Sequence, residues 1–471
     1  MIQFGTGGWR AVIGDEFTKE NIQLLAKALS NKMKDEEVEE KGMVIGYDRR
    51  FLSKEAMQWA GRVFAAEGIK TYLINRSSPT PLIMFYVMKH EFPYGMMVTA
   101  SHNPAIYNGI KVFTEGGRDA DEFQTKALEE YISHVKKEDV REMEYEEALK
   151  NGMIVEINPL NEYLDNIISA VDMKAIRDRG LKVALDPMYG VSETSLKTIL
   201  LTARCEVETI HDRHDTLFGG KLPAPSAHTL RALQNHVIDK RCDIGIATDG
   251  DADRIGVIDD TGRFLHPNDI LVLLYYYLVK YKGWHGPVVR NIATTHMLDK
   301  VAERFGEKCY EVPVGFKYIS AKMQETDAVI GGESSGGLTV RGHIKGKDGI
   351  YAASLLVEMI AVTGKKLSEI AKEIETECGS IYMEERDYKF NQEKKEQIYQ
   401  ILMLDKELPE LNFDIDKISY LDGCKVYFKN GGWIIARFSG TEPLLRIFCE
   451  MPNPEDAKQL CNLYEEFLKL K

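Results

Sequence analysis

The sequence lacks any hydrophobic run long enough to cross a membrane. Its longest apolar run extends from Ile270 to Val279, about half of the roughly 20 residues that a bilayer span requires, so a buried helix is expected there. The first ten residues have neither a basic start nor an apolar core, and no secretion signal is expected. The seven cysteines are scattered and include no Cys-x-x-Cys pair, which favours a reduced, cytoplasmic protein without structural zinc.

Positive charge is present but falls short of the negative charge. The 60 lysines and arginines are outnumbered by 73 acidic residues, for a net charge of −13. A nucleic-acid partner is disfavoured, because it would need a basic face, whereas a local basic site for an anionic small molecule is still possible. No membrane association and no obligate protein partner are indicated. The 44% hydrophobic content is ordinary for a soluble globular chain, and 471 residues suffice for about three domains.

Short β-branched runs alternate with helical patterns through the first two-thirds of the chain, and this cycle starts three times. The last hundred or so residues differ, with predicted short strands between helices at 392–404 and 454–470. The pattern predicts three related α/β domains with mixed sheets and a smaller C-terminal α+β domain. The expected domains are 1–150, 151–262, 263–376 and 377–471.

Polar loops follow the third predicted strand of each α/β unit. The strands at 95–99, 243–248 and 328–330 lead into Thr-Ala-Ser-His-Asn-Pro, Asp-Gly-Asp-Ala-Asp-Arg and Gly-Gly-Glu-Ser-Ser-Gly. Ligands bind beyond the carboxyl ends of strands in open α/β sheets. Three such loops at equivalent positions predict that the domains surround one central cleft.

The acidic loop indicates a metal site. Asp249, Asp251 and Asp253 alternate, so an extended turn can direct all three carboxylates toward a hard cation such as Mg²⁺. A calcium-binding EF-hand is disfavoured, because Arg254 and Asp260 stand where glycine and glutamate are needed. A solvated acidic turn is the alternative, but the loop lies between two apolar strands.

The serine loop is the candidate for covalent chemistry. A hydroxyl at a strand end, near a metal, suits Ser101 to carry a phosphoryl group, although the same loop could only shape the backbone. His102 alone is more typical of a loop-stabilising hydrogen bond than of proton transfer. The sequence has no Gly-x-Ser-x-Gly, so an acyl-transfer serine is not supported.

Further polar segments suit anions and hydroxyl groups. The segment 437–443, Arg-Phe-Ser-Gly-Thr-Glu-Pro, can form an anion nest, with a hairpin turn as the alternative. Glu333 and Ser335 lie in a glycine-rich loop and could bind sugar hydroxyls or form a simple polar turn. Arg10 and Lys111 lie in or near glycine-rich segments and could bind an anion. They indicate an anion site only in combination with the other motifs.

The four loops, in this order and at about this spacing, resemble the α-D-phosphohexomutases. The chain is similar to the phosphoglucomutase/phosphomannomutase family over its whole length, and its Gly-Thr-Gly-Gly-Trp-Arg and Asn-Gly-Ile-Lys segments match as well. The resemblance implies three α/β domains and a smaller α+β domain. It also implies a phosphoserine at Ser101, with Mg²⁺ held by a phosphoryl oxygen and the three aspartates. A hexose 1,6-bisphosphate would be the intermediate between hexose 1- and 6-phosphates.

The resemblance also implies roles for the other motif residues. Arg10 and Arg254 would offset charge on the moving phosphoryl group, and His102 adjoins it. Lys111 could move the sugar hydroxyl proton if cations around it depress its pKa. Glu333 and Ser335 would hold the sugar. The non-transferred phosphate would be bound by Arg437, Ser439, Gly440 and Thr441.

One departure from the family pattern bears on the substrate. Some relatives have a histidine directly after the Gly-Glu-x-Ser-Gly loop, whereas this chain has Gly337. The segment Gly342–Gly349 instead resembles glucomutase-type relatives, so His343 and Lys347 could share the acid–base or phosphate role. Which of Lys111, His343 and Lys347 acts as acid–base stays open. The segment favours glucose, with mannose possible and glucosamine disfavoured.

Two other classes of function compete with a mutase. A Mg²⁺-dependent sugar-phosphate phosphatase would use the same parts if water reached the phosphoserine, so water exclusion by domain closure separates the two. A non-catalytic sugar-phosphate sensor would not need a metal–serine pair. The presence of Ser101, the three aspartates and Arg437 counts against it.

Overall fold

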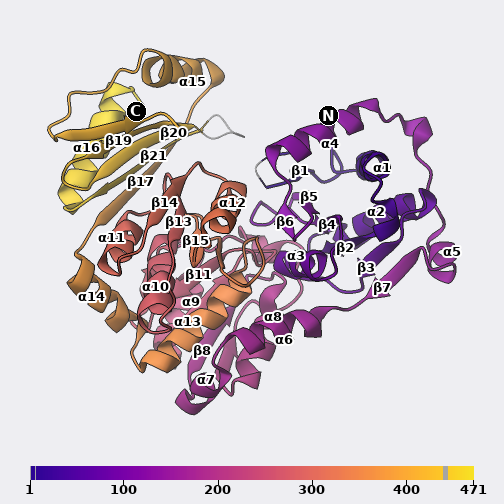
Figure 1. Cartoon of the computed structure of the whole chain (residues 1–471), viewed down its shortest axis with the longest axis horizontal. Coiled ribbons are helices and arrows are strands. Elements are labelled where there is room, and N and C mark those ends of the chain that lie inside the picture. Colours follow the sequence, from indigo (N-terminus) through magenta and orange to yellow (C-terminus); the bar gives the residue numbers. More distant parts are fainter. Residues whose placement is uncertain (1, 6, 439–443, 471) are drawn as a thin grey trace.

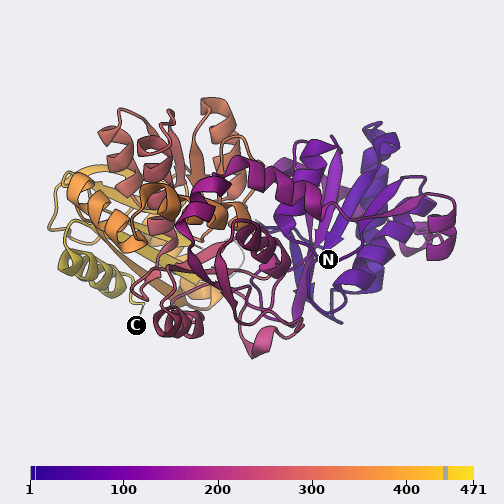
Figure 2. The same ribbon diagram turned by 90° about the horizontal axis from the view of Figure 1, so that it is seen from below.

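The computed structural model describes residues 2–5, 7–438 and 444–470. The chain forms four sheets, each with its own helices, and the resulting domains follow one another in an arc (Figure 1). Figure 2 shows the first and fourth domains at opposite ends of the molecule. The predicted fold class, three α/β domains with mixed sheets and a smaller C-terminal domain, is confirmed.

The first sheet has the strand order β1-β5-β4-β2-β3-β7, with β6 beside β5. Strands β4, β2, β3 and β7 are parallel, whereas β5 is antiparallel to both of its neighbours on this path. Both β2 and β4 are buried throughout, because helices cover both faces of the sheet. The bounds are β1 (Trp9–Val12), β2 (Met43–Tyr47), β3 (Thr71–Ile74), β4 (Tyr94–Val98), β5 (Tyr107–Thr114), β6 (Arg118–Asp119), β7 (Ile154–Ile157), α1 (Lys19–Asp35), α2 (Ser53–Ala66), α3 (Thr80–Lys89), α4 (Glu122–His134) and α5 (Tyr145–Lys150). The boundary expected at residue 150 therefore falls before the last strand of this sheet.

The second and third sheets repeat this plan of parallel strands flanked by antiparallel ones, in the orders β12-β11-β10-β8-β9 and β14-β13-β15-β16. The second domain contains α6 (Leu160–Ala170), α7 (Met173–Arg179), β8 (Lys182–Asp186), α8 (Ser192–Thr202), β9 (Glu206–Thr209), α9 (Arg231–Lys240), β10 (Ile244–Thr248), β11 (Ile255–Ile258) and β12 (Phe264–Leu265). The third contains α10 (Pro267–Lys280), β13 (Val288–Asn291), α11 (Met297–Arg304), β14 (Cys309–Val312), α12 (Phe316–Thr326), β15 (Ile330–Gly332), β16 (Leu338–Val340), α13 (Gly349–Thr363) and α14 (Leu367–Cys378). Short 3₁₀ turns lie at Glu39–Lys41, Lys137–Asp139 and Phe218–Gly220.

The longest apolar run forms the buried helix that the sequence predicts. Every residue from Ile270 to Val279 in α10 is buried. Helix α13 is similarly buried and packs against α7 and α8 of the second domain, so one apolar core continues across the first three domains. Within the described residues, no helix combines the length and the apolar character that a bilayer crossing requires.

The fourth domain is an antiparallel sheet in the order β17-β21-β20-β19-β18. Its elements are β17 (Tyr382–Lys389), α15 (Gln392–Tyr399) with a π-helical turn (Gln400–Leu404), β18 (Ile415–Ser419), β19 (Cys424–Phe428), β20 (Trp433–Phe438), β21 (Leu444–Met451) and α16 (Pro454–Phe467). The three inner strands match the predicted ones. The edge strands β17 and β18 were not predicted, because edge positions are largely solvated and their sequences are rich in charge.

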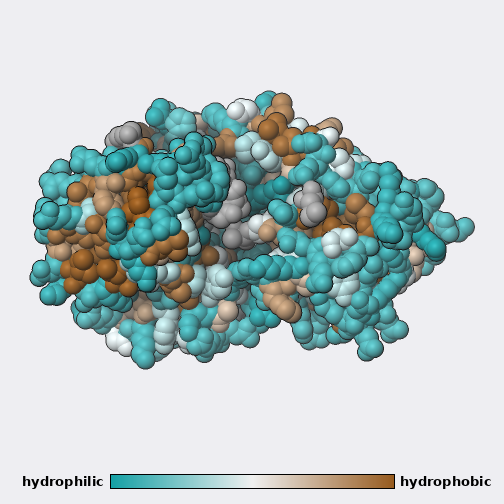
Figure 3. Space-filling model, turned by 90° about the horizontal axis from the view of Figure 1, so that it is seen from above, coloured by the Kyte–Doolittle hydropathy of each residue, from teal (hydrophilic) through white to brown (hydrophobic). Residues whose placement is uncertain are grey.

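The polar loops of the first three domains approach one another at the carboxyl ends of β4, β10 and β15. A Cβ atom on Gly250 would lie 2.7 Å from the carbonyl oxygen of Ser101, so only glycine permits this approach of the second domain to the first. A β-bridge joins Arg254 to Gly337 and thereby links the second and third domains. Figure 3 shows a hollow between the two halves of the molecule, bordered by hydrophilic residues.

Candidate functional site

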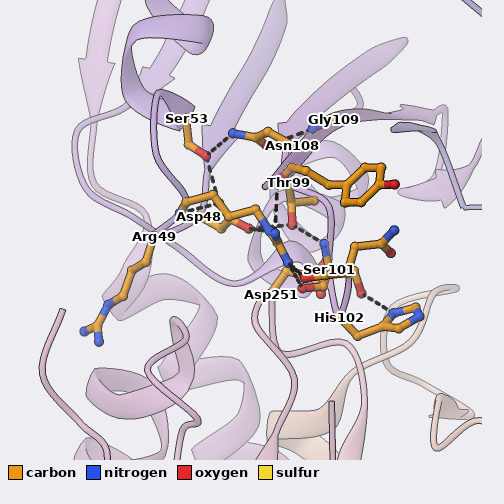
Figure 4. Close-up of polar contacts among 12 residues, drawn as sticks. Asp48, Arg49, Ser53, Thr99, Ser101, His102, Asn108, Gly109 and Asp251 are labelled. Atoms are coloured by element: carbon orange, nitrogen blue, oxygen red, sulfur yellow. Dashed lines mark hydrogen bonds and ion pairs between the residues drawn. The ribbon is translucent and has the colours of Figure 1, made fainter. Parts of the chain in front are cut away.

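Ser101 follows β4 in a strained backbone conformation. Its φ of 52° is uncommon for a non-glycine residue, and the backbone N–H of Ser101 donates to Thr99 Oγ1 at 2.8 Å. Strain of this kind gathers at functional sites, where the surrounding structure maintains it. The Ser101 hydroxyl is thereby directed away from its own strand and toward the second domain (Figure 4).

Arg50 holds the serine loop through its backbone carbonyl groups, a contact that the sequence did not predict. Its guanidinium donates to four carbonyl oxygens of that loop, at 2.6 to 2.9 Å: those of Ser101, Asn103, Pro104 and Tyr107. The guanidinium also stacks over the Phe218 ring at 4.8 Å. Arg50 is 3% exposed, so these bonds form in a site with little competing water.

A second group of buried polar residues fixes the strand ends that carry Arg50 and the serine loop. Asp48 accepts hydrogen bonds from the hydroxyls of Thr99 at 2.6 Å and Ser53 at 2.8 Å. Asn108 donates to the Ser53 hydroxyl at 2.9 Å and accepts from the Gly109 backbone (Figure 4). Asp48 and Thr99 follow β2 and β4, Ser53 begins α2, and Asn108 lies in β5. The first sheet and this helix therefore set the position of the serine loop.

The serine and the acidic loop are in direct contact across the domain boundary. Ser101 Oγ donates to Asp249 Oδ2 at 2.7 Å, and the backbone N–H of Arg254 donates to Asp249 Oδ1 at 3.1 Å. Thr80 in the first domain binds Asp251 through its hydroxyl at 2.6 Å and its backbone N–H at 2.9 Å. The predicted proximity of the serine and the three aspartates is therefore observed.

The acidic loop fits a divalent cation. One oxygen from each of Asp249, Asp251 and Asp253 lies within 4.8 Å of the others, and all three side chains are buried. Asp251 Oδ1 and Asp253 Oδ1 are buried without a hydrogen-bond partner among the described residues. Burial, together with the carboxylates of Asp251 and Asp253, raises the pKa of Asp249 well above its usual range. A hard cation such as Mg²⁺ would supply the missing partner for these oxygens.

Lys111 lies between two of these carboxylates. Its Nζ donates to Asp251 Oδ2 and to Asp253 Oδ2, both at 2.7 Å. Burial by itself would lower the pKa of Lys111, but the two carboxylates outweigh burial and raise it. The condition for proton transfer by Lys111, a pKa lowered by neighbouring cations, is therefore not met, because two carboxylates contact its ammonium group.

Arg10 and Arg254 form the cationic side of the site, and His102 lies beside them. Arg10 Nη1 donates to Asn103 Oδ1 at 2.6 Å. The Nε atoms of Arg10 and Arg254 are buried without a hydrogen-bond partner among the described residues, and Arg254 Nε lies 3.9 Å from Asp253 Oδ1. Burial, followed by the charges of Arg254 and Arg10, lowers the pKa of His102 well below its usual range. His102 is therefore a neutral imidazole beside Ser101, whose Oγ lies 3.3 Å from its Nδ1. The unpartnered arginine donors suit an anion.

The structure separates the two residues predicted from the segment 342–349. Lys347 reaches the acidic loop, with its Nζ 3.1 Å from Asp253 Oδ2. His343 is instead buried: its Nε2 lies 2.7 Å from Asp348 Oδ2, and its ring packs on Tyr351 at 4.3 Å. Asp348 caps the N-terminus of α13, so His343 stabilises a helix start and is not placed for the predicted acid–base role.

Asp119 is a further acidic residue of the site that sequence reasoning missed. Burial raises the pKa of Asp119, although Lys347 and Lys111 act in the opposite direction. Asp119 ends β6 and lines a cavity of about 370 Å³ between the first and third domains, together with Lys317 and Lys345. The pair Gly116–Gly117 just before β6 is the feature of the sequence that indicates a tight return of the chain here.

Glu333 lies at the end of β15 and contacts two neighbouring loops. Its Oε1 accepts from the Gly315 backbone N–H at 3.1 Å and from Asn291 at 3.4 Å, and Ser335 Oγ donates to Oε2 at 3.3 Å. Arg437, at the end of β20, is held by Asp422, whose Oδ1 accepts from Arg437 Nε at 3.0 Å. Ser439, Gly440 and Thr441 lie outside the described residues.

Four family models match consecutive parts of the chain. Those of phosphoglucomutase/phosphomannomutase α/β/α domains I, II and III match residues 1–139, 161–262 and 266–378, and that of the C-terminal domain matches 394–465. The matches cover the serine loop, the acidic loop and the Glu333 loop in one domain each.

Individual relatives extend along nearly the whole chain. The phosphoglucomutase/phosphomannomutase of Thermococcus kodakarensis is 29% identical over 99% of both chains. A probable phosphoglucosamine mutase of Pyrococcus furiosus is 30% identical over 97% of this chain and 95% of its own. The crystal structure of a putative phosphomannomutase from Thermus thermophilus superposes with a TM-score of 0.85, at 30% identity over 99% of both chains. The similarity thus includes the order of the domains and not only their individual folds.

Proposed function

The chain belongs to the phosphoglucomutase/phosphomannomutase family, and we propose that it interconverts hexose 1-phosphates and hexose 6-phosphates through a phosphoserine at Ser101. The proposal is carried by the contact between Ser101 Oγ and Asp249 Oδ2, at 2.7 Å. This contact places the hydroxyl of a residue with a strained backbone beside a buried acidic cluster that fits a divalent cation. Phosphoryl transfer requires little more than such positioning and neutralisation of charge.

The residues around Ser101 would have three different roles in phosphoryl transfer: metal binding, neutralisation of charge and positioning of the serine. Asp249, Asp251 and Asp253 would hold Mg²⁺, which when bound supplies positive charge next to the phosphoryl group. Arg10 and Arg254 each have a buried Nε donor without a hydrogen-bond partner among the described residues, and both would neutralise phosphoryl oxygens. Arg50 and the groups around Asp48 hold the serine carbonyl and amide, so that the nucleophile stays fixed while its hydroxyl reacts.

The sugar must be accepted in two orientations. Phosphoserine would donate to a hexose phosphate to form a hexose 1,6-bisphosphate, which would turn over in the cleft and return its other phosphate to Ser101. Glu333 and Ser335 would hold the hydroxyl groups in both orientations, and Arg437 would bind the phosphate that is not being transferred. Lys111 and Lys347 are the two remaining candidates for moving the hydroxyl proton, since both reach Asp253.

We propose glucose as the preferred sugar, with mannose as a second substrate. The support is the segment Gly342–Gly349, which resembles glucomutase-type relatives and brings Lys347 to the site. Relatives named as phosphoglucosamine mutases make glucosamine the competing substrate to test. A ³¹P NMR time course with the three sugar 1-phosphates, Mg²⁺ and a trace of glucose 1,6-bisphosphate ranks the sugars by the order in which their 6-phosphates form.

The variant Ser101→Ala tests the phosphoserine. We expect no mutase turnover and nearly unchanged binding of glucose 1-phosphate by calorimetry, because only the nucleophile is removed. Ser133→Ala, at an exposed position of α4, is the matched control and should keep wild-type activity. Turnover of Ser101→Ala at the wild-type rate would contradict the proposal. Growth of inorganic phosphate in place of 6-phosphates would identify a phosphatase whose cleft admits water.

A further inference from the structure

The two carboxylate oxygens of Asp422 accept hydrogen bonds from two different domains. Its Oδ1 accepts from Arg437 Nε within the fourth domain at 3.0 Å, and its Oδ2 accepts from the backbone N–H of Val314 in the third domain at 2.9 Å. Asp422 precedes β19 and Val314 follows β14, so they are far apart in sequence. One side chain therefore joins the phosphate-binding arginine to a loop of the neighbouring domain.

The same loop is held from its other side by the sugar-binding glutamate. The backbone N–H of Gly315, next to Val314, donates to Glu333 Oε1 at 3.1 Å. Two consecutive amides are thus bound by two carboxylates, one from each domain. Gly315 has φ of 130°, a conformation that side chains rarely adopt, which makes this arrangement of the two amides specific to glycine.

The turn that carries Asp422 is fitted tightly to the arginine strand. A Cβ atom on Gly423, where φ is 100°, would lie 2.6 Å from the carbonyl oxygen of Ala436 and 3.1 Å from Arg437 Cα. The turn therefore has little freedom relative to Arg437. Among the described residues the Arg437 guanidinium bonds through Nε. Its two terminal nitrogens could then bind a phosphate, the geometry in which arginine binds anions with two parallel donors.

Other contacts hold the third and fourth domains together without Asp422. Lys425 is fully buried and donates to the carbonyl oxygen of Ile292 at 2.6 Å and to Glu311 at 2.8 Å. Glu450 accepts from the backbone N–H of His296 at 2.8 Å. An apolar cluster that includes Ile292 and Trp433 lies beside them. Because these contacts stabilise the interface, Asp422 is not needed to hold the third and fourth domains together.

We propose that Asp422 is a positioning residue, which orients Arg437 toward the substrate phosphate and couples it to Glu333 through the loop at Val314 and Gly315. The inference rests on the proposed function, because it takes Arg437 as a phosphate ligand and Glu333 as a sugar ligand. Binding of the phosphate by Arg437 and of the sugar by Glu333 are then linked through one rigid connection. The position of Arg437 in the fourth domain would thus depend on the position of the Glu333 loop in the third domain.

Binding of glucose 6-phosphate, measured by calorimetry, tests this role with Asp422→Ala, Asp422→Asn, Arg437→Ala and the Asp422/Arg437 double variant. We expect Asp422→Ala to weaken binding and raise KM about tenfold, with kcat nearly unchanged, as for loss of one charged hydrogen bond. In the Arg437→Ala background the same change should add less than about twofold, because both variants remove one function. Asp387→Ala removes an exposed aspartate that also pairs with an arginine, and is the control.

Several outcomes would overturn the role of Asp422. Unchanged or tighter binding by Asp422→Ala would show that the carboxylate only competes with phosphate for Arg437. Additive losses in the double variant would show that Asp422 does not act through Arg437. Asp422→Asn keeps the shape and carries the same test if the alanine variant unfolds. A wild-type protein that binds hexose phosphate without turning it over refutes the proposed function alone, whereas normal wild-type turnover with an unaffected Asp422→Ala refutes the inference alone.

Discussion

Lys347 passes through the space that a side chain at position 337 would fill. A Cβ atom on Gly337 would lie 2.2 Å from Lys347 Cδ and 2.8 Å from its Cγ. Lys347 continues from there to Asp253, with Nζ at 3.1 Å. The glycine that departs from the pattern of some relatives is therefore the condition for Lys347 to reach the acidic loop, and the two positions act as a pair.

The variant Gly337→Ala should displace Lys347 from Asp253. Because the added methyl group overlaps the middle of the lysine chain, we expect a stability loss of about 1–3 kcal/mol and a clear loss of mutase activity. Chemical unfolding and steady-state kinetics measure the two effects. In Gly337→Ala/Lys347→Ala the overlap is gone, so stability should recover while activity stays at the level of Lys347→Ala. A double variant no more stable than Gly337→Ala would contradict this explanation.

Replacing Arg50 by lysine should loosen the serine loop. A lysine cannot bond the carbonyl oxygens of Ser101, Asn103, Pro104 and Tyr107 together, because its three donors diverge from one nitrogen. We expect Arg50→Lys to cost about 3 kcal/mol of unfolding free energy, since buried carbonyl groups lose charged donors, and to lower kcat. Urea unfolding and mutase kinetics check this prediction.

The neighbouring arginine provides the matched control for that experiment. Arg49 donates one hydrogen bond to the backbone of Asp212 and lies 3.8 Å from Glu193. Arg49→Lys should therefore change stability by less than about 1 kcal/mol and leave kcat near the wild-type value. Equal effects of the two substitutions would show that the carbonyl contacts of Arg50 have no special importance.

Mg²⁺ should stabilise the folded protein through the acidic loop. Ligand present at about 100 times its dissociation constant adds roughly 2.7 kcal/mol to the stability, which appears as a rise in melting temperature. We expect this rise in the wild type and its loss in Asp251→Asn, where a ligand of reduced charge replaces the carboxylate. Asp165→Asn, at an exposed position of α6, is the control and should keep the full rise. A similar rise in both variants would place the metal elsewhere, and chelation should abolish mutase activity.

The pair His266 and Glu385 should make the contact between α10 and β17 sensitive to pH. Burial lowers the pKa of His266, but the hydrogen bond to Glu385, 3.2 Å away, outweighs burial and raises it above 6.5. A raised folded pKa contributes stability that is complete below pH 6.5 and is lost as pH rises through the folded value. Glu385→Gln should therefore be less stable than the wild type at about pH 5.5 and equally stable at about pH 9.

The expected difference is small. The pair is about one-third exposed, and a protonated ring can no longer accept the Asn268 backbone N–H at Nδ1, so we expect about 0.5 kcal/mol. Thermal unfolding of both proteins across this pH range measures it. A difference that grows with pH would reverse the assigned sign and refute the role of the pair.

The residues that meet at the candidate site could be predicted where they depend on local spacing. The alternating aspartates, the serine after a buried strand and the glycine-rich loops each lie within a few residues, and the carboxyl ends of strands in one sheet meet at one edge. The contact partners of Lys111 and His343 could not be predicted in this way. Lys111 contacts acids that lie about 140 residues away, and the partner of His343 is the capping aspartate of a helix whose start is set by packing.

The supporting residues were missed for a related reason. Arg50 is one of two adjacent arginines after a strand, and its sequence environment does not indicate that it bonds carbonyl groups between residues 101 and 107. The edge strands β17 and β18 lack the apolar alternation of half-buried strands, because their charged side chains face solvent. Such positions acquire their structure from the strand beside them.

The sequence by itself determined that this chain forms three α/β domains and a smaller fourth one, with a serine, three aspartates and the Glu333 loop at strand ends, because periodicity and short motifs are local properties. Only the tertiary structure decided which charged side chain contacts which polar group of another domain or loop. It placed Lys111 and Lys347 on the acidic loop, Arg50 on the serine loop and Asp422 between Arg437 and Val314. These pairings depend on how separate domains pack, and Coulomb and hydrogen-bond energies act over distances in space that sequence separation does not fix.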